Sequence, residues 1–335
     1  MKKIRYGIIG YGLFAEKAIA PAILATSNST LVALQKRSMT EALDRALRAG
    51  IPHAFTSAAE LARCADVDAV FIASANSAHC AETITAAEAG KHVLVEKPMA
   101  MNVAECRRMV DACNAHGVKL MVGQVVRFSP AVGAIRELVR TGALGRIVNA
   151  RADFFIDTRQ TQRTWFYNRA VAGGGPVFDI GVHCLDTLYY VLDDRVIGVR
   201  SQLSPSPTEK ATEHSAVMAL EFSRGTVASI SVSFQAPGRL SVLELIGTEA
   251  AVLVQDFTQS SRNTTVLISR RGNDGSMQQE ARTIEVPNLV TLEVEAFSKC
   301  ILEGLESPVP GTTGIHHQSV LDLAMTGGGF LKEGK

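Results

Sequence analysis

Gly7-Ile8-Ile9-Gly10-Tyr11-Gly12-Leu13-Phe14-Ala15 is the stretch of sequence that decides the fold. It joins a short apolar run to a predicted helix, and its last part has the form Gly10-x-Gly12-x-x-Ala15. Gly10 permits a tight turn, Gly12 lets the backbone approach a pyrophosphate, and Ala15 allows the helix to pack closely on the strand. The N-terminus of the helix then faces the phosphates. The motif predicts a dinucleotide-binding turn, rather than a purely structural one, with cofactor contacts from Gly10, Gly12, Leu13 and Phe14.

Around this turn, the first part of the chain alternates short apolar runs with helical patterns. This alternation is typical of repeated βαβ units with a parallel sheet. The predicted strands are 5–9, 31–35, 69–72, 92–96 and 119–123, and helical periodicity covers 40–49 and 78–89. Residues 1–125 are therefore predicted to form a doubly wound α/β domain, an NAD(P)-binding Rossmann domain.

Beyond residue 125 the pattern changes to longer segments of alternating polarity. Turn signals such as Ser223-Arg224-Gly225 and Gly247-Thr248-Glu249 join several of them, as in antiparallel hairpins. The predicted strands are 147–155, 215–222, 226–234, 240–246, 251–255 and 264–269, and the predicted helices are 178–192, 291–303 and 316–325. Residues 126–310 should form an α+β domain, and 311–335 a C-terminal helix that returns to pack on the body.

Composition narrows the class of protein. The chain has 335 residues, 47% of them hydrophobic, and its net charge of +1 favours neither nucleic acid nor an anionic membrane. No apolar run reaches the roughly 18 residues of a membrane helix, so we expect a soluble, cytoplasmic protein with a small-molecule partner. The cysteines include no CxxC pair, which predicts reduced thiols and no metal site.

Cofactor choice depends on the end of the second predicted strand, where an acidic residue would bind the ribose hydroxyls of NAD. This chain has Gln35-Lys36-Arg37-Ser38 there. A carboxylate would repel a 2′-phosphate, whereas Lys36, Arg37 and the Ser38 hydroxyl can hold one by charge-assisted hydrogen bonds. The pattern favours NADP, with NAD as the alternative. The alternative interpretation is that the two basic residues are solvated charges in a loop and do not bind a cofactor.

A lysine follows another buried strand, in Glu96-Lys97-Pro98. Open α/β sheets bind ligands at the carboxyl ends of their strands. Partial burial can tune such a lysine for proton transfer at neutral pH, so Lys97 is a candidate catalytic residue. The alternative is a surface lysine paired with Glu96.

An acid and a histidine occur one helical turn apart after the glycine run, in Asp179-x-x-x-His183. This spacing places both side chains on one face, where they could orient a substrate hydroxyl and move its proton. Two ligands alone do not make a metal site. A structural pair with no chemistry is the alternative.

These elements, in this order, resemble the Gfo/Idh/MocA oxidoreductase family over nearly the whole chain. The resemblance lies in the opening glycine turn and in four further stretches: Ser74-Ala75-Asn76-Ser77-Ala78-His79, the run from Ala89 through Glu96-Lys97-Pro98 to Ala100, Arg127-Phe128-Ser129-Pro130, and the run from Gly173 to Leu188. Within the family, the pattern is most similar to NADP-dependent sugar reductases of the 1,5-anhydrofructose reductase type and to sugar 1-dehydrogenases.

The resemblance implies a Rossmann domain followed by a domain with a large open, mainly antiparallel sheet, which forms the contact of a homodimer or homotetramer. It implies that Lys97 and His183 are catalytic, that Asp179 is the family's carboxylate, and that Lys97-Pro98 is cis. The remaining residues that it assigns to the cofactor are Ser74, Asn76, His79, Glu96, Lys97, Arg127 and Trp165.

This chain departs from the family at two places. Ser74-Ala75-Asn76 stands where Thr-Pro-Asn is usual, and Phe166 follows Trp165 where relatives have arginine. Arg163 or Arg169 is a candidate for the missing cation.

The sequence therefore predicts an NAD(P)-dependent oxidoreductase that interconverts a hydroxyl or hemiacetal and a carbonyl on a sugar, cyclitol or sugar derivative, by direct hydride transfer. One alternative is a glycosidase or lyase that uses bound NAD for transient oxidation. The other is a nucleotide-binding regulator without catalysis.

Overall fold

The computed structural model of the chain describes residues 2–159, 161 and 164–331. It divides into two compact units. Unit 1 comprises Met1–Gln124 and Val290–Gln318, and unit 2 comprises Val125–Leu289 and Ser319–Lys335. The first division falls one residue before the boundary predicted at 125/126, and residues 290–318 join unit 1.

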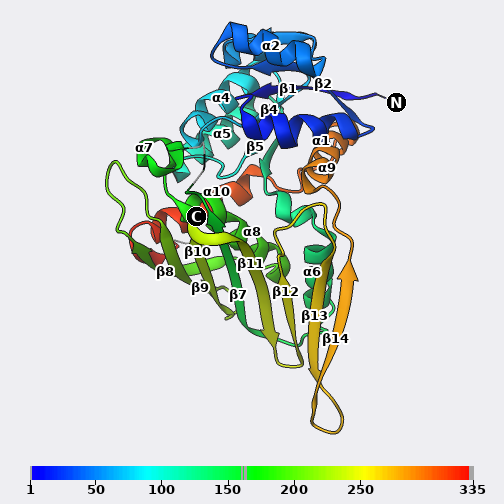
Figure 1. Ribbon diagram of the computed structural model, residues 1–335, viewed down its shortest axis with the longest axis vertical. Helices are drawn as coiled ribbons and strands as arrows, with labels where there is room; N and C mark the ends of the chain where they lie inside the picture. Colours follow the sequence, from blue (N-terminus) through cyan, green and yellow to red (C-terminus); the bar gives the residue numbers. More distant parts are fainter. Residues whose placement is uncertain (1, 160, 162–163, 332–335) are drawn as a thin grey trace. The chain divides into compact units, whose positions relative to one another are not determined.

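Unit 1 is built on a parallel sheet with the strand order β3-β2-β1-β4-β5-β6. Every residue of β4 and β6 is buried, as expected for strands covered on both faces. Helices lie on the two sides of this sheet in Figure 1. The strands are β1 (Ile4–Ile9), β2 (Ser29–Gln35), β3 (His53–Phe55), β4 (Ala69–Ile72), β5 (His92–Glu96) and β6 (Leu120–Gly123).

Several helices of unit 1 begin at an N-cap residue whose polar side chain accepts a hydrogen bond from the first turn. Ser38 accepts a hydrogen bond from the Glu41 amide at the start of α2, and Ser57 forms a capping box with Glu60 at the start of α3. The helices are η1 (Ala15–Ile19), α1 (Ala20–Ala25), α2 (Met39–Ala49), α3 (Ala58–Arg63), α4 (Asn76–Glu88), α5 (Val103–Ala115) and α9 (Leu289–Glu303). The division between the units falls inside α10 (Gly311–Ala324).

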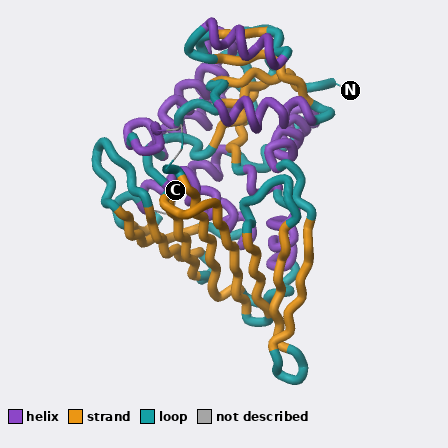
Figure 2. Tube along the Cα trace, viewed as in Figure 1, coloured by secondary structure: helices purple, strands orange, loops and turns teal. Residues whose placement is uncertain are grey.

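Unit 2 is built on a mixed sheet with the order β14-β13-β12-β11-β7-β10-β9-β8-β15, in which only the β10–β7 pair among the described strands is parallel. Figure 2 shows its strands side by side. They are β7 (Ile147–Asp157), β8 (Val196–Ser204), β9 (Ser215–Phe222), β10 (Val227–Ser233), β11 (Gln235–Gly247), β12 (Ala250–Gln255), β13 (Thr264–Arg271), β14 (Met277–Ile284) and β15 (Gly328–Phe330).

One face of the large sheet is buried and the other is exposed. Along β9, Met218 and Leu220 are buried whereas Val217 and Glu221 are exposed. This alternation is typical of an antiparallel sheet with one covered face. Helix α8 packs on β7, and α6 packs on α8. The helices of unit 2 are η2 (Val125–Phe128), α6 (Pro130–Arg140), η3 (Thr164–Tyr167), α7 (Arg169–Ala172), η4 (Val177–Gly181) and α8 (Val182–Leu192).

A buried ion pair fixes α8 to η2. Arg127 Nε and Nη2 donate to the Asp186 carboxylate at 2.8 and 2.6 Å, and the side chains are only 9% and 1% exposed. The guanidinium carbon also lies 5.5 Å from the Tyr189 ring centroid and 5.3 Å from that of Tyr190. These aromatic contacts add cation–π attraction to the ion pair.

The doubly wound α/β domain and the second domain with its mainly antiparallel sheet are confirmed. Strands β3, β8, β14 and β15 were not predicted. Strand β14 is exposed along nearly its whole length and carries no apolar alternation that a sequence pattern could show. Among the described residues, the structure has no helix that is both long and apolar enough to cross a membrane.

We expect Asp186→Asn to lower the free energy of unfolding by about 3–5 kcal/mol, because it leaves the Arg127 charge buried without its partner. Urea denaturation measures this loss. Asp193→Asn is the matched control, since it removes an exposed pair with Arg136 and should cost less than about 1 kcal/mol. Equal losses in the two variants would show that burial does not set the importance of the Arg127–Asp186 pair.

Candidate functional site

The glycine turn of unit 1 is held by a close backbone approach. Gly10 has φ +78°, and a Cβ there would lie 2.6 Å from the backbone N and Cα of Ser74. The Gly10 amide donates to Gln35 Oε1 at 3.0 Å, and the Gly12 amide donates to the Gly10 carbonyl at 2.7 Å. Only glycine fits at position 10, as the sequence motif requires.

The residues after this turn fit a dinucleotide. A Cβ built on Gly12 meets only the Gly10 oxygen, at 3.9 Å, so the backbone here is open to a close approach by a phosphate. Leu13 and Phe14 are 49% and 36% exposed. Gly10, Gly12, Leu13 and Phe14 thus share one accessible turn before η1, which supports their predicted contact with a cofactor.

The basic segment after β2 contains two cations, of which Lys36 has partners within the protein and Arg37 is exposed. Lys36 Nζ lies 3.1 Å from Glu41 Oε2 and donates to the Tyr11 carbonyl at 3.2 Å. Ser38 Oγ accepts from the Glu41 amide. Arg37 is exposed. Of the three residues predicted to hold a 2′-phosphate, Arg37 is therefore the best placed to reach one without losing an internal contact.

His79 joins the loop after β4 to the loop after β5. It is fully buried, with Nδ1 3.0 Å from the Pro98 carbonyl oxygen and Nε2 3.3 Å from that of Ser74. Burial lowers the pKa of His79 to about 4, so the ring is neutral and only one of its nitrogens carries a proton. The structure places His79 where it supports these two loops from within the domain.

Glu82 supports the same loop from α4, and sequence analysis missed it. Ser74 Oγ donates to Glu82 Oε2 at 2.5 Å, and burial raises the pKa of Glu82 to about 7. Glu82 lies within a helix pattern that gives no sign of this contact with the loop before the helix. Asn76, also predicted to bind the cofactor, is buried in the first turn of α4.

Lys97 directly follows β5. Its backbone amide donates to Glu96 Oε2 at 3.2 Å, and both side chains are half-buried. The Lys97-Pro98 bond is cis, as the family resemblance implies. Lys97 thus occupies the carboxyl end of a parallel strand, the edge where open α/β sheets bind ligands.

Asp179 and His183 stand out on a helix that is otherwise buried. From Gly174 to Leu188 they are the two half-exposed residues, and every other residue is buried. Asp179 lies in the π-helical segment η4, and His183 lies in the first turn of α8. The His183 ring centroid is 6.2 Å from that of Phe154 on β7. The helix therefore presents both predicted catalytic groups on its accessible side.

A third charged group lies near this pair, and sequence analysis missed it. The Arg239 guanidinium carbon is 4.7 Å from the centroid of the Phe154 ring, and Nη2 donates to the Thr258 carbonyl at 2.8 Å. Desolvation lowers the pKa of Arg239, while the negative charge of Asp179 opposes that shift. Arg239 is far from the glycine run in sequence, so no local motif connects it with Asp179.

Glu213 fixes the start of the helical segment that carries Asp179 and His183. Its Oε1 atom accepts hydrogen bonds from the amides of Gly175 and Val177 at 2.9 and 3.0 Å. A Cβ at Gly175 would lie 2.1 Å from the Glu213 carbonyl oxygen, which explains the need for glycine there. Burial raises the pKa of the Glu213 carboxyl. This residue, too, was missed, because only the folded chain brings it to the glycine run.

The other predicted cofactor residues have partners in unit 2. Arg127 pairs with Asp186, and the Trp165 ring meets that of Phe166 edge-on at 4.4 Å. Of the two candidate replacement cations, Arg163 lies outside the described residues. Arg169 Nη1 donates to the Thr208 carbonyl at 3.2 Å.

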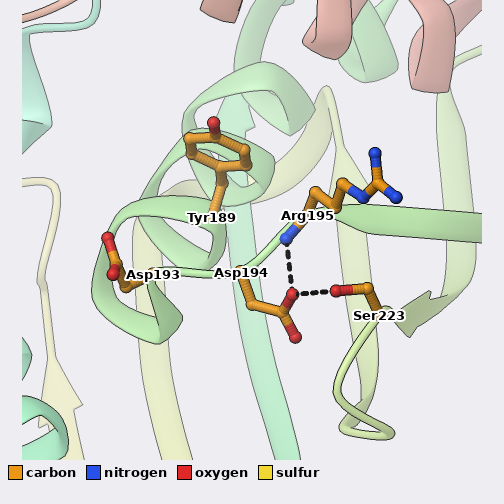
Figure 3. Close-up of a pocket in the computed structure, with 5 residues that line it drawn as sticks. All are labelled: Tyr189, Asp193, Asp194, Arg195 and Ser223. Atoms are coloured by element: carbon orange, nitrogen blue, oxygen red, sulfur yellow. Dashed lines mark hydrogen bonds between the residues drawn. The ribbon is translucent and has the colours of Figure 1, made fainter. Parts of the chain in front are cut away.

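A pocket of about 330 Å³ lies at the C-terminal end of α8, at the opposite end of that helix from His183 (Figure 3). Asp194 accepts hydrogen bonds there from the Arg195 amide at 2.8 Å and from Ser223 Oγ at 2.5 Å. Because the pocket lies at and beyond the last turn of α8, whereas His183 lies in the first turn, the pocket is not part of the candidate site. Its lining residues are Tyr189, Asp193, Asp194, Arg195 and Ser223.

Comparison with known proteins identifies the family. A model described as an oxidoreductase family with an NAD-binding Rossmann fold matches residues 4–124, and the C-terminal domain model of the Gfo/Idh/MocA family matches residues 132–253. The 1,5-anhydro-D-fructose reductase of Ensifer adhaerens is 32% identical over 306 residues, which cover 91% of this chain and 90% of that protein. The chain belongs to the Gfo/Idh/MocA oxidoreductase family.

Solved structures agree with this assignment. The aldose-aldose oxidoreductase of Caulobacter crescentus, complexed with glycerol, superposes with a TM-score of 0.87 at 27% identity, over 98% of this chain and 100% of that one. A levoglucosan dehydrogenase in complex with NADH and L-sorbose has the same fold, with a TM-score of 0.86 at 22% identity over 98% and 97% of the two chains. The predicted family and its oxidoreductase class are confirmed, and unit 1 contains the family's nicotinamide-cofactor domain.

We expect Glu82→Gln to flatten the pH dependence of stability. The usual pKa of a glutamate is 4.5, so below that pH Glu82 is protonated in both the folded and the unfolded chain. Between pH 4.5 and about pH 7, Glu82 keeps its proton only in the folded chain. Stability conferred by the neutral carboxyl is therefore lost as pH rises through this window. One pKa unit corresponds to about 1.4 kcal/mol, so the fall is on the order of 1–3 kcal/mol.

Urea denaturation at pH 5 and pH 7 measures this change. Glu88→Gln is the matched control, because Glu88 lies on the same helix and is exposed. The interpretation fails if Glu82→Gln and the wild-type protein lose equal stability over this interval.

Proposed function

We propose that this chain is an NADP-dependent oxidoreductase that interconverts a hydroxyl or hemiacetal and a carbonyl on a sugar, cyclitol or sugar derivative. The observation that carries the proposal is the pair Asp179 and His183, which are half-exposed on an otherwise buried helix. Support also comes from the similarity to 1,5-anhydro-D-fructose reductase and to an aldose-aldose oxidoreductase. A spectrophotometric screen of aldoses, ketoses and inositols at about 340 nm, the absorbance of reduced nicotinamide, tests it.

The cofactor, when bound, supplies or accepts the hydride. The chain's own residues bind it through the turn at Gly10 and Gly12. Lys97 hydrogen-bonds the reacting oxygen of the substrate, and His183 lies beside it as the second acid–base group; one of these two residues gives a proton to that oxygen or takes one from it. Asp179 orients His183 or a neighbouring hydroxyl, and Glu213 holds the helix start from which both project.

The preference for NADP rests on Arg37. Its guanidinium is exposed after β2, where a planar cation can form paired hydrogen bonds with a phosphate. NAD remains the alternative cofactor. We further propose that the exposed face of the large sheet forms the contact of a homodimer or homotetramer, since Val217, Val227 and Leu240 are each more than half exposed on its strands.

We expect NADPH to bind more tightly than NADH and Arg37→Ala to narrow that difference by about 1.5–3 kcal/mol, the contribution of hydrogen bonds to a charged group. Fluorescence titration of each variant with both cofactors gives the two affinities. Arg48→Ala removes an exposed cation from α2 that pairs with Asp44, and should leave the ratio unchanged. Tighter binding of NADH by the wild-type protein would contradict the assignment.

We expect Lys97→Ala to lower kcat by roughly 10² or more while cofactor affinity stays nearly unchanged, because a general acid or base is lost. Steady-state kinetics and cofactor titration separate the two effects. Lys299→Ala, an exposed lysine of α9, is the control. If Lys97→Ala retains more than about a tenth of the wild-type kcat, the proton comes from another group.

We expect the pH–rate profile to have a limb between about pH 6 and 8 that His183→Asn abolishes, as for a titrating histidine. Asp179→Asn should move this limb to lower pH, because the amide no longer favours the imidazolium. The double variant should be little worse than the poorer single one, since the groups share one role. If the losses in kcat are additive and the pH limb is unchanged in both single variants, Asp179 and His183 contribute only to packing and binding.

A further inference from the structure

Three different metal-ligating side chains converge in unit 1, away from the glycine turn. His53 begins β3, Cys64 directly follows α3, and Asp66 lies in the turn before β4. One ligand atom from each lies within 4.8 Å of the other two. His53 Nε2 is 2.9 Å from Asp66 Oδ2. Tetrahedral zinc bonds of about 2.0–2.3 Å would need only a small adjustment of these side chains.

The charges around the cluster are of both signs, and the two neighbouring cations, Arg5 and Lys91, have other partners as well. Arg5 contacts Asp66 Oδ1 at 3.1 Å, but its Nε and Nη2 atoms donate to Asp68 at 3.0 and 2.8 Å. The Arg5 charge is therefore shared between Asp68 and one oxygen of Asp66, and the other oxygen, Asp66 Oδ2, faces His53. Deprotonated Cys64 would add a second negative charge next to Asp66. Lys91 is directed to backbone oxygens, with Nζ donating to the carbonyls of Cys64 and Val67.

We propose that His53, Cys64 and Asp66 form a Zn²⁺ site. An imidazole nitrogen, a thiolate and a carboxylate are the ligand types that Zn²⁺ takes, and a water would complete four-coordination. Binding releases the thiol proton and requires a neutral imidazole, so affinity rises with pH. The sequence did not predict this site, because helix α3 separates His53 from the other two ligands along the chain and the sequence has no CxxC motif.

The ion would fix the edge of the parallel sheet. Strand β3 pairs with β2 alone in this sheet, and the Phe55 carbonyl at its end accepts from the Lys36 amide at 3.1 Å. A metal bound to His53, Cys64 and Asp66 ties β3 to the turn that leads into β4. It should therefore stabilise the folded chain, which binds it as a formed site, against the unfolded chain.

The test uses the full chain after treatment with a chelator. Competition between the protein and a chromophoric zinc indicator should show one Zn²⁺ per chain, and Co²⁺ in its place should give a cobalt–thiolate charge-transfer band. Cys64→Ser and His53→Gln should each weaken Zn²⁺ binding about tenfold or more. His116→Gln, an exposed histidine elsewhere in unit 1, should bind as the wild type does.

Thiol reactivity gives a readout that needs no variant. Cys64 is half-exposed whereas the other five cysteines are buried, so a disulfide reagent should modify Cys64 first. One equivalent of Zn²⁺ should slow that reaction about tenfold or more, and the chelator should restore it. The proposal is overturned if Zn²⁺ leaves the rate unchanged, or if His53→Gln binds Zn²⁺ as tightly as the wild type.

Discussion

The close approach of Gly10 to the Ser74 backbone is the constraint on which the cofactor domain depends. A side chain at position 10 would have its Cβ 2.6 Å from Ser74. His79 lies between Ser74 and Pro98. Its Nε2 atom contacts the Ser74 carbonyl oxygen, and its Nδ1 atom contacts the Pro98 carbonyl oxygen. Pro98 follows Lys97 in the cis peptide. The glycine turn and the candidate catalytic lysine are therefore connected by one short series of contacts, in which the neutral His79 ring donates to one carbonyl and packs against the other.

The continuous helical segment of unit 2 formed by η4 and α8 is fixed at two places along its length. Glu213 binds the amides of Gly175 and Val177 before it, and Arg127 binds Asp186 on α8. Both anchors are buried carboxylates, whose removal leaves unpaired donors in a low-dielectric interior. Between them lie Asp179 and His183. Such a rigid support suits the role proposed for these two groups, because small misplacements of groups that act on one substrate are costly in rate.

Much of this arrangement could be predicted from the sequence, because it rests on local signals. The glycine turn, the lysine after β5 and the Asp179–His183 spacing each belong to one strand or helix, and strands β4 and β5 begin and end where apolar runs predict them. The exposed strand β14 lacks such a signal. Glu213 and Arg239 could not be found, because each acts on residues from a distant part of the chain. Glu82 was missed for another reason: a helical pattern does not show which of its residues contacts the loop before the helix. The contact of Lys36 with the Tyr11 carbonyl, which helps to leave Arg37 as the principal candidate for a 2′-phosphate, also required the folded structure.

The central claim is that hydride passes between the cofactor and a sugar-like substrate, and isotope transfer tests it most directly. The protein is incubated with NADPH carrying two deuterium atoms at nicotinamide C4 and with a carbonyl substrate from the screen, and the product is analysed by mass spectrometry. The account predicts one deuterium per product molecule, bound to carbon, with one NADPH oxidised per turnover. A substrate converted without deuterium uptake and without net NADPH oxidation would contradict it and would indicate an enzyme that recycles its cofactor.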